Sequence, residues 1–106
     1  MFARKVSVRL KAEAAGQFLQ KMENEIIPLL RKQHGFLDEL TLISQSGKEV
    51  YAYSFWESSE DAERYENTAF REVTSLLTGL LEGTVRINTY MVANSTFHKL
   101  AAAVAS

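Results

Sequence analysis

Apolar and polar side chains alternate in four stretches of the chain, with the period of two that is typical of half-buried β-strands. These stretches cover about residues 5–11, 36–43, 49–56 and 85–91. Gln45-Ser46-Gly47 lies between the second and third stretches and predicts a turn that joins them as a β-hairpin.

A spacing of three and four residues predicts a helix between the first two strands. The apolar stripe is formed by Phe18, Met22, Ile26, Leu29 and Leu30, and the helix is expected over about residues 13–33. Pro28 lies inside it and is expected to kink the helix rather than end it, because the apolar period continues to Leu30. Gly35 then suits the left-handed position that closes a helix.

A second helical region follows the hairpin. Ser58 and Asp61 have the spacing of a capping box, and helical spacing continues to Leu81 with a break expected at Asn67-Thr68. The order β-α-β-β-α-β predicts an α+β, ferredoxin-like domain with one four-stranded antiparallel sheet and helices on one side. We expect this domain over residues 1–94. A tail over residues 95–106 is expected to form a short helix that docks through Phe97 and Leu100.

The third strand presents different side chains to its two sides. Tyr51, Tyr53 and Phe55 alternate with Ala52 and Ser54, so the three aromatic residues share one face of the sheet. If helices cover the other face, these aromatics would lie in water in a monomer. We therefore expect a homodimer through the sheet faces, and the alternative is a monomer with scattered exposed aromatics.

The helix-covered side of the third strand is a candidate ligand site. Small Ala52 and Ser54 beneath Phe18 and Met22 would leave a cavity, unless larger side chains of the first helix fill the space. Trp56, at the end of this strand, and Tyr65, on the following helix, carry polar groups that would orient a flat ligand. The alternative is that Trp56 and Tyr65 are core aromatic residues whose polar groups bond to the backbone or to solvent. The candidate ligand-binding residues are Trp56, Tyr65, Ser54, Ala52, Phe18 and Met22.

Composition excludes several classes of function. The 106 residues have a formal net charge of -1, which offers no field for nucleic acid or an anionic membrane surface. The absence of cysteine excludes disulfides and thiolate chemistry, and His34 and His98 stand in no metal-ligand pattern. With no signal-peptide pattern or membrane span in the sequence, we expect a cytoplasmic protein. The acidic residues between 57 and 66 are expected to form a solvated helix face.

Two junctions resemble those of a known family. The stretch from Pro28 to Leu37, with Gly35-Phe36, is similar to the helix-to-strand Pro-Gly-Phe junction of the antibiotic biosynthesis monooxygenase (ABM) superfamily. The run from Trp56 to Ala62 resembles the family's Trp-x-Ser-x-x-x-Ala junction. With the order of strands, the resemblance covers about residues 2–93.

This resemblance implies a dimeric α/β barrel that binds a small apolar or aromatic molecule between sheet and helices. It further implies a cofactor-independent monooxygenase, with neither metal nor flavin. A non-catalytic ligand-binding or interaction module and a small-molecule isomerase are the alternatives. Two positions depart from the family pattern, because His34 replaces the proline of the first junction and Tyr65 stands where members often carry histidine. The departures, with no asparagine on the first strand, disfavour the haem-degrading activity of some members.

Overall fold

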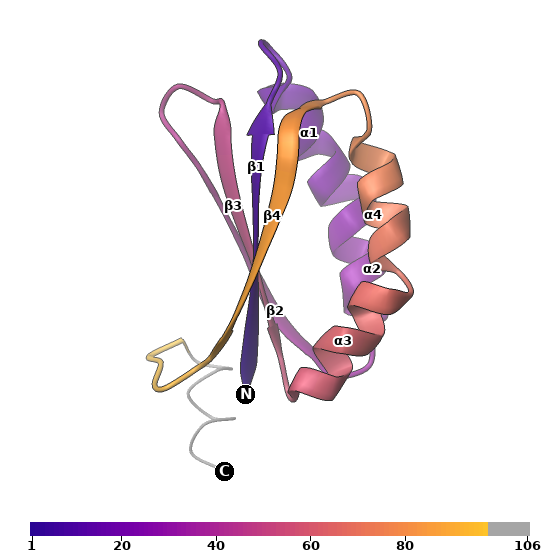
Figure 1. Cartoon of the computed structure of the whole chain (residues 1–106), viewed down its shortest axis with the longest axis vertical. Coiled ribbons are helices and arrows are strands. Elements are labelled where there is room, and N and C mark those ends of the chain that lie inside the picture. The colour runs from indigo at the N-terminus through magenta and orange to yellow at the C-terminus, as the bar shows by residue number, and fades with distance from the viewer. Residues whose placement is uncertain (98–106) are drawn as a thin grey trace.

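The computed structural model describes residues 1–97 and contains one antiparallel sheet with helices on one of its sides (Figure 1). The strands are β1 (Phe2–Leu10), β2 (Phe36–Ile43), β3 (Glu49–Trp56) and β4 (Leu81–Met91). They lie in the order β2-β3-β1-β4, so the first strand occupies a central position. The predicted α+β, ferredoxin-like arrangement is confirmed.

The first helical segment is continuous but not uniform. It consists of α1 (Ala15–Lys21), a π-helical turn η1 (Met22–Ile26) and α2 (Ile27–Arg31). Pro28 lies in the first turn of α2, where a residue without a backbone N–H is tolerated. The helical segment continues past Pro28 as predicted, and a widened π turn ends two residues before the proline. Gly35 has φ +80° and occupies the left-handed conformation that the sequence predicted.

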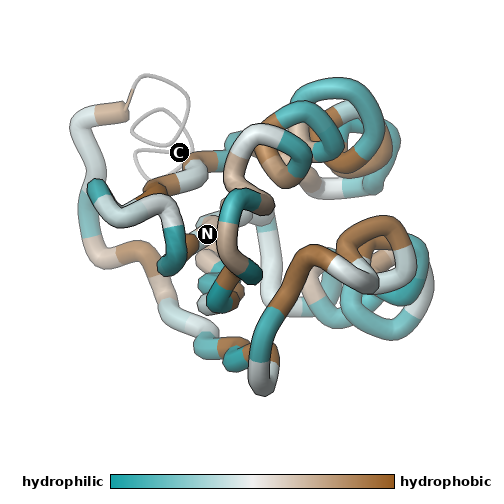
Figure 2. The backbone as a smooth tube through the Cα atoms, turned by 90° about the horizontal axis from the view of Figure 1, so that it is seen from above, coloured by the Kyte–Doolittle hydropathy of each residue, from teal (hydrophilic) through white to brown (hydrophobic). Residues whose placement is uncertain are grey.

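The second helical region is divided into α3 (Ser59–Asn67) and α4 (Phe70–Leu77), as the sequence predicted. Ser58 precedes α3 in extended conformation, and the Asp61 backbone N–H donates a hydrogen bond to its Oγ at 3.2 Å. Both helical regions lie on the same side of the sheet, which Figure 2 shows from above.

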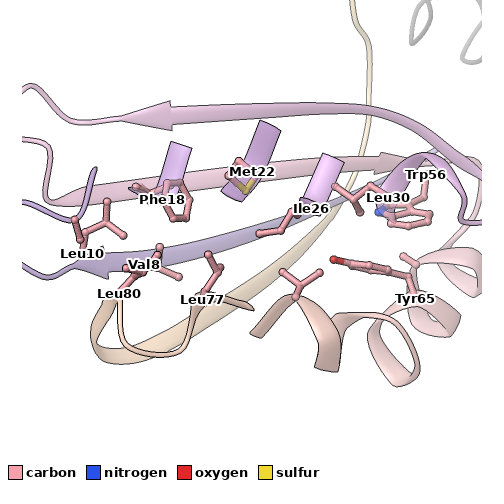
Figure 3. Close-up of a cluster of buried hydrophobic side chains, with 14 residues drawn as sticks. Val8, Leu10, Phe18, Met22, Ile26, Leu30, Trp56, Tyr65, Leu77 and Leu80 are labelled. Carbon is pink, nitrogen blue, oxygen red and sulfur yellow. The ribbon is translucent and has the colours of Figure 1, made fainter. Parts of the chain in front are cut away.

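The main core fills the space between the helices and the sheet (Figure 3). Val8, Leu10 and Val50 from the strands meet Phe18 and Ile26 from the first helical segment, and all five are buried. A smaller cluster lies on the opposite face of the sheet and contains Ala3, Leu37 and Phe55. The sheet therefore buries apolar side chains on both faces, but within residues 1–97 helices cover only one of them.

The C-terminal segment was predicted to be helical from residue 95. Residues 92–97 form no helix, although the ring centroids of Phe97 and Phe55 lie 6.5 Å apart on the uncovered face. The rest of the predicted tail helix, with Leu100, lies outside the described residues.

Candidate functional site

A cavity of about 60 Å³ lies between the sheet and the helices and is partly open to solvent. Its walls are mostly apolar. Phe18, Met22 and Ile26 line it from the first helical segment, and Val73 and Leu77 line it from α4. The apolar stripes that bring these helices onto the sheet therefore also form the cavity wall.

The sheet contributes polar side chains to one end of this cavity. Glu39, Ser54 and Arg4 all line it, and they lie in register on three neighbouring strands. Glu39 is opposite Ser54, and Ser54 is opposite Arg4, so all three point to the helix-covered side. Glu39 and Arg4 are separated by two strand spacings, roughly 10 Å. We call these three residues the polar row.

Arg4 is the most unusual member of the polar row, because it is only 2% exposed. Its Nη2 donates to Oε1 of Glu66 at 3.2 Å, and that carboxylate is 42% exposed. The guanidinium carbon lies 4.0 Å from the ring centroid of Phe70 and 5.4 Å from that of Tyr65. Arginine is rarely buried without full pairing, and an ion pair with aromatic contacts on the guanidinium offsets part of its desolvation.

Ser54 is held by Trp56. The indole N–H of Trp56 donates to Ser54 Oγ at 2.9 Å, and both side chains are buried. The Trp56 ring stacks on Tyr65 with centroids 5.0 Å apart, and Figure 3 shows the Tyr65 hydroxyl directed into the core cluster. Trp56 therefore orients Ser54 and supports Tyr65 from behind the cavity.

Burial changes the acid–base properties of two cavity residues. It raises the pKa of Tyr65 to about 12, with the positive charge of Arg4 opposing the shift. Tyr65 thus keeps its proton at physiological pH. Burial also raises the pKa of Glu39, while the hydrogen bond from Thr41 lowers it and the charge of Glu23 raises it further. Glu39 is the carboxylate in the polar row.

The structure brings five of the six predicted site residues to the cavity: Tyr65, Ser54, Ala52, Phe18 and Met22. Trp56 does not line it, because its ring packs behind Tyr65 and its N–H is used by Ser54. Sequence reasoning missed Arg4 and Glu39. The parity of β1 offered a signal for Arg4, since it lies two residues before Val6 and shares its face.

The expected solvated acidic face is wrong for two of its members. Asp61 is buried and contacts Arg64, with Nη1 and Oδ1 3.1 Å apart, and Glu66 pairs with Arg4. His34 is exposed at the junction between helix and strand, and its Nε2 lies 3.7 Å from Oδ1 of Asp61.

Within residues 1–97 no group of three His, Cys, Asp or Glu side chains is placed to hold a metal ion. None of the helices in this part of the chain is long and apolar enough to cross a membrane.

Solved structures with this fold include several oxygenases. A putative antibiotic biosynthesis monooxygenase from Nitrosomonas europaea matches with TM-score 0.73 and 15% identity, covering 88% of this chain and 99% of that one. SnoaB, a cofactor-independent oxygenase from Streptomyces nogalater, matches with TM-score 0.73 and 12% identity, covering 90% of this chain and 95% of that one.

A third similar structure carries a ligand. The monooxygenase from the gene ActVA-Orf6 of Streptomyces coelicolor, in complex with Nanaomycin D, has TM-score 0.65 and 20% identity, covering 89% of this chain and 88% of that one. At such identities these likenesses show the fold alone. A search of curated proteins finds no match. The family model for antibiotic biosynthesis monooxygenase, however, matches residues 1–73. This chain therefore belongs to the antibiotic biosynthesis monooxygenase family.

Proposed function

We propose that this protein binds a small aromatic molecule in the cavity between sheet and helices and oxidises it with O₂, without metal or flavin. The single observation that carries the proposal is the cavity itself, with apolar walls and one polar row on its floor. Family membership and the oxygenases of similar fold support the same chemistry.

The proposed substrate is a phenol or enol, because its anion is electron-rich enough to react with O₂ at carbon. One oxygen atom becomes a new ring carbonyl and the other leaves as water, so that a phenol and one O₂ give a quinone and one water. The substrate supplies all four electrons. The protein must remove the phenolic proton, stabilise the resulting oxyanion and exclude water.

The described side chains fit these three tasks. Glu39 is the candidate base, because burial makes it a stronger proton acceptor than an ordinary carboxylate. Tyr65, which holds its proton, is the candidate donor to the oxyanion. The apolar walls limit the access of water.

The size of the cavity limits the substrate. A cavity of about 150 Å³ holds one benzene ring, and drug-sized ligands occupy about 300–1,000 Å³. At about 60 Å³ this cavity must widen even for one ring, and the flexible side chain of Met22 is the wall residue best suited to move. We therefore propose single-ring substrates rather than polycyclic ones.

Oxygen uptake tests the proposal. Chelator-treated protein is given single-ring phenols and hydroquinones and, for comparison, an anthrone, with isotopically labelled O₂. We expect protein-dependent uptake with one labelled atom in the product. Glu39→Gln should lower the rate by about 10²-fold or more, the usual contribution of a general base. The matched control Glu60→Gln, an exposed carboxylate on α3, should not change it.

The alternatives give different results in the same experiment. Saturable binding with neither O₂ uptake nor chemical change would contradict oxygenation and leave a binding module. A product of unchanged mass would indicate an isomerase that uses Glu39 and Tyr65 as acid–base groups. That second candidate is favoured by one observation, a carboxylate of raised pKa inside the cavity.

We also propose that two copies associate through the uncovered faces of their sheets. The support for this is a set of exposed apolar side chains on that face, which includes Leu40, Leu42 and Tyr51.

A further inference from the structure

The feature that the proposed reaction leaves unexplained is the Nε atom of Arg4. This atom is buried and has no hydrogen-bond partner among residues 1–97. The same guanidinium satisfies another nitrogen by donating to Glu66, so Arg4 has a fixed orientation rather than a disordered one. A buried charged donor without a partner is costly and calls for an explanation, and a bound ligand that accepts its hydrogen bond is one.

Ser54 provides a second donor beside this one. Its Oγ accepts the hydrogen bond of the Trp56 indole, so the acceptor side of the hydroxyl is used and its proton remains available for another partner. Ser54 and Arg4 are directly opposite each other on β3 and β1, which places their Cβ atoms about 4.5–5.5 Å apart. Both side chains line the cavity. Two donors, one of them cationic, thus converge at one end of an apolar space.

We propose that this end of the cavity is a carboxylate-binding site and that the natural ligand is a small aromatic monocarboxylate. One carboxylate oxygen accepts from Arg4 Nε and the other from Ser54 Oγ. The apolar part of the ligand lies against Phe18, Met22 and Val73. This inference rests on the proposed function, because it assumes that the cavity binds a small molecule.

The charges in the site favour a singly charged ligand. Glu66 already neutralises part of the Arg4 charge from its partly exposed position, so a dianion such as phosphate would be poorly compensated among apolar walls. A carboxylate arrives ionised at neutral pH, whereas a phenol arrives neutral and needs a base first. Glu39, at the far end of the polar row, lies two strands from Arg4 and is suited to a hydroxyl on the opposite side of the ring.

The test compares benzoate with benzyl alcohol, which has nearly the same shape and no charge. Binding to the wild-type chain is measured by saturation-transfer NMR and calorimetry. We expect benzoate to bind about tenfold more tightly or better, as a charge-assisted hydrogen bond in a buried site requires. Arg4→Met should abolish this preference and leave the affinity for benzyl alcohol within about twofold, because the remaining walls are apolar. The matched control is Arg9→Met on the same strand, an exposed residue paired with Glu49, and it should keep the preference.

A second measurement needs no variant and covers the case in which Arg4→Met fails to fold. In nitrogen-15-labelled wild-type protein, the Nε–H resonance of Arg4 should shift on addition of benzoate and not of benzyl alcohol. Equal affinity of both probes, or a preference that survives Arg4→Met, would overturn the carboxylate site while the proposed cavity function stands. Binding of neither probe, nor of the phenols, would overturn both.

Discussion

At the scale of single residues, position rather than residue type decides which side chains can take part in chemistry. Glu49, paired with Arg9, and Glu39 are both glutamates on neighbouring strands, yet of these two only Glu39 lines the cavity. Burial there raises the pKa of Glu39. Tyr65 is likewise the tyrosine in which burial raises the pKa to about 12. The polar row thus combines a carboxyl group, a cation and a hydroxyl at one end of the cavity.

Glu39 gives a prediction about pH and stability. Because its pKa is higher in the folded chain, the carboxyl holds its proton more tightly there than when unfolded. Its contribution to stability is therefore fully present below the ordinary value of 4.5 and is lost as the pH rises through the folded pKa. Glu39→Gln should raise the melting temperature at neutral pH, and the gain should shrink in acid. A melting curve with equal gain at both pH values would contradict burial as the cause.

At the scale of elements, the junction between helix and strand depends on close packing around Gly35. A Cβ atom placed there would collide with the carboxylate of Asp61, the residue that receives a hydrogen bond from Ser58 Oγ at 2.9 Å. Asp61 also pairs with Arg64. The glycine therefore permits both a left-handed backbone and the approach of the start of α3, which sets the position of Tyr65 over the sheet.

Gly35→Ala should consequently be strongly destabilising. The left-handed backbone costs an alanine about 1–2 kcal/mol, and the collision with Asp61 adds about 1–3 kcal/mol. Gly47→Ala is a matched control, because Gly47 has φ +76° but would meet only Ala15 Cβ at 3.7 Å. The free energy of unfolding of Gly47→Ala should fall only by the cost of the left-handed backbone. Urea unfolding of both variants measures this difference. An equal fall in the free energy of unfolding would show that the Asp61 side chain moves aside without destabilising the fold.

At the scale of the whole molecule, the helices of the described part of the chain cover one face of the sheet and leave the other without helices (Figures 1 and 2). On the uncovered face, Phe55 is buried and Tyr53 stacks beside it with ring centroids 6.3 Å apart. Four other apolar side chains of the strands on that face are at least 36% exposed, namely Leu40, Leu42, Tyr51 and Tyr90. Leu40 is directly opposite Tyr53 and Leu42 is directly opposite Tyr51, so apolar side chains gather on this face as expected for an interface.

We predict that these side chains are covered in a two-fold dimer. Tyr51→Glu should weaken association strongly, since burial of such a side chain is worth about 1.5–3 kcal/mol and occurs twice in a symmetric dimer. Leu19→Glu is the control, because Leu19 is 45% exposed on α1, which lies on the helix-covered side. Sedimentation or light scattering at micromolar concentration measures the effect. A wild-type monomer, or equal loss in both variants, would contradict the prediction.

Much of the fold is determined by the sequence alone. Periods of two and of three to four residues specify which segments become strands and helices, and strand parity specifies their faces, because these relations are local. Gly35 and Ser58 mark element ends for the same reason. The sequence also indicated some of the cavity residues, since Ala52, Ser54, Phe18 and Met22 belong to faces that must meet.

Only the tertiary structure decided the rest. The N–H of Trp56 is used by Ser54, and the pairing of Arg4 with Glu66 joins residues 62 positions apart, so neither contact follows from local spacing. The raised pKa of Glu39 depends on how deeply its strand is covered. Local periodicity fixes which way a side chain points, whereas its partners, its burial and its charge state are properties of the surfaces that packing brings together.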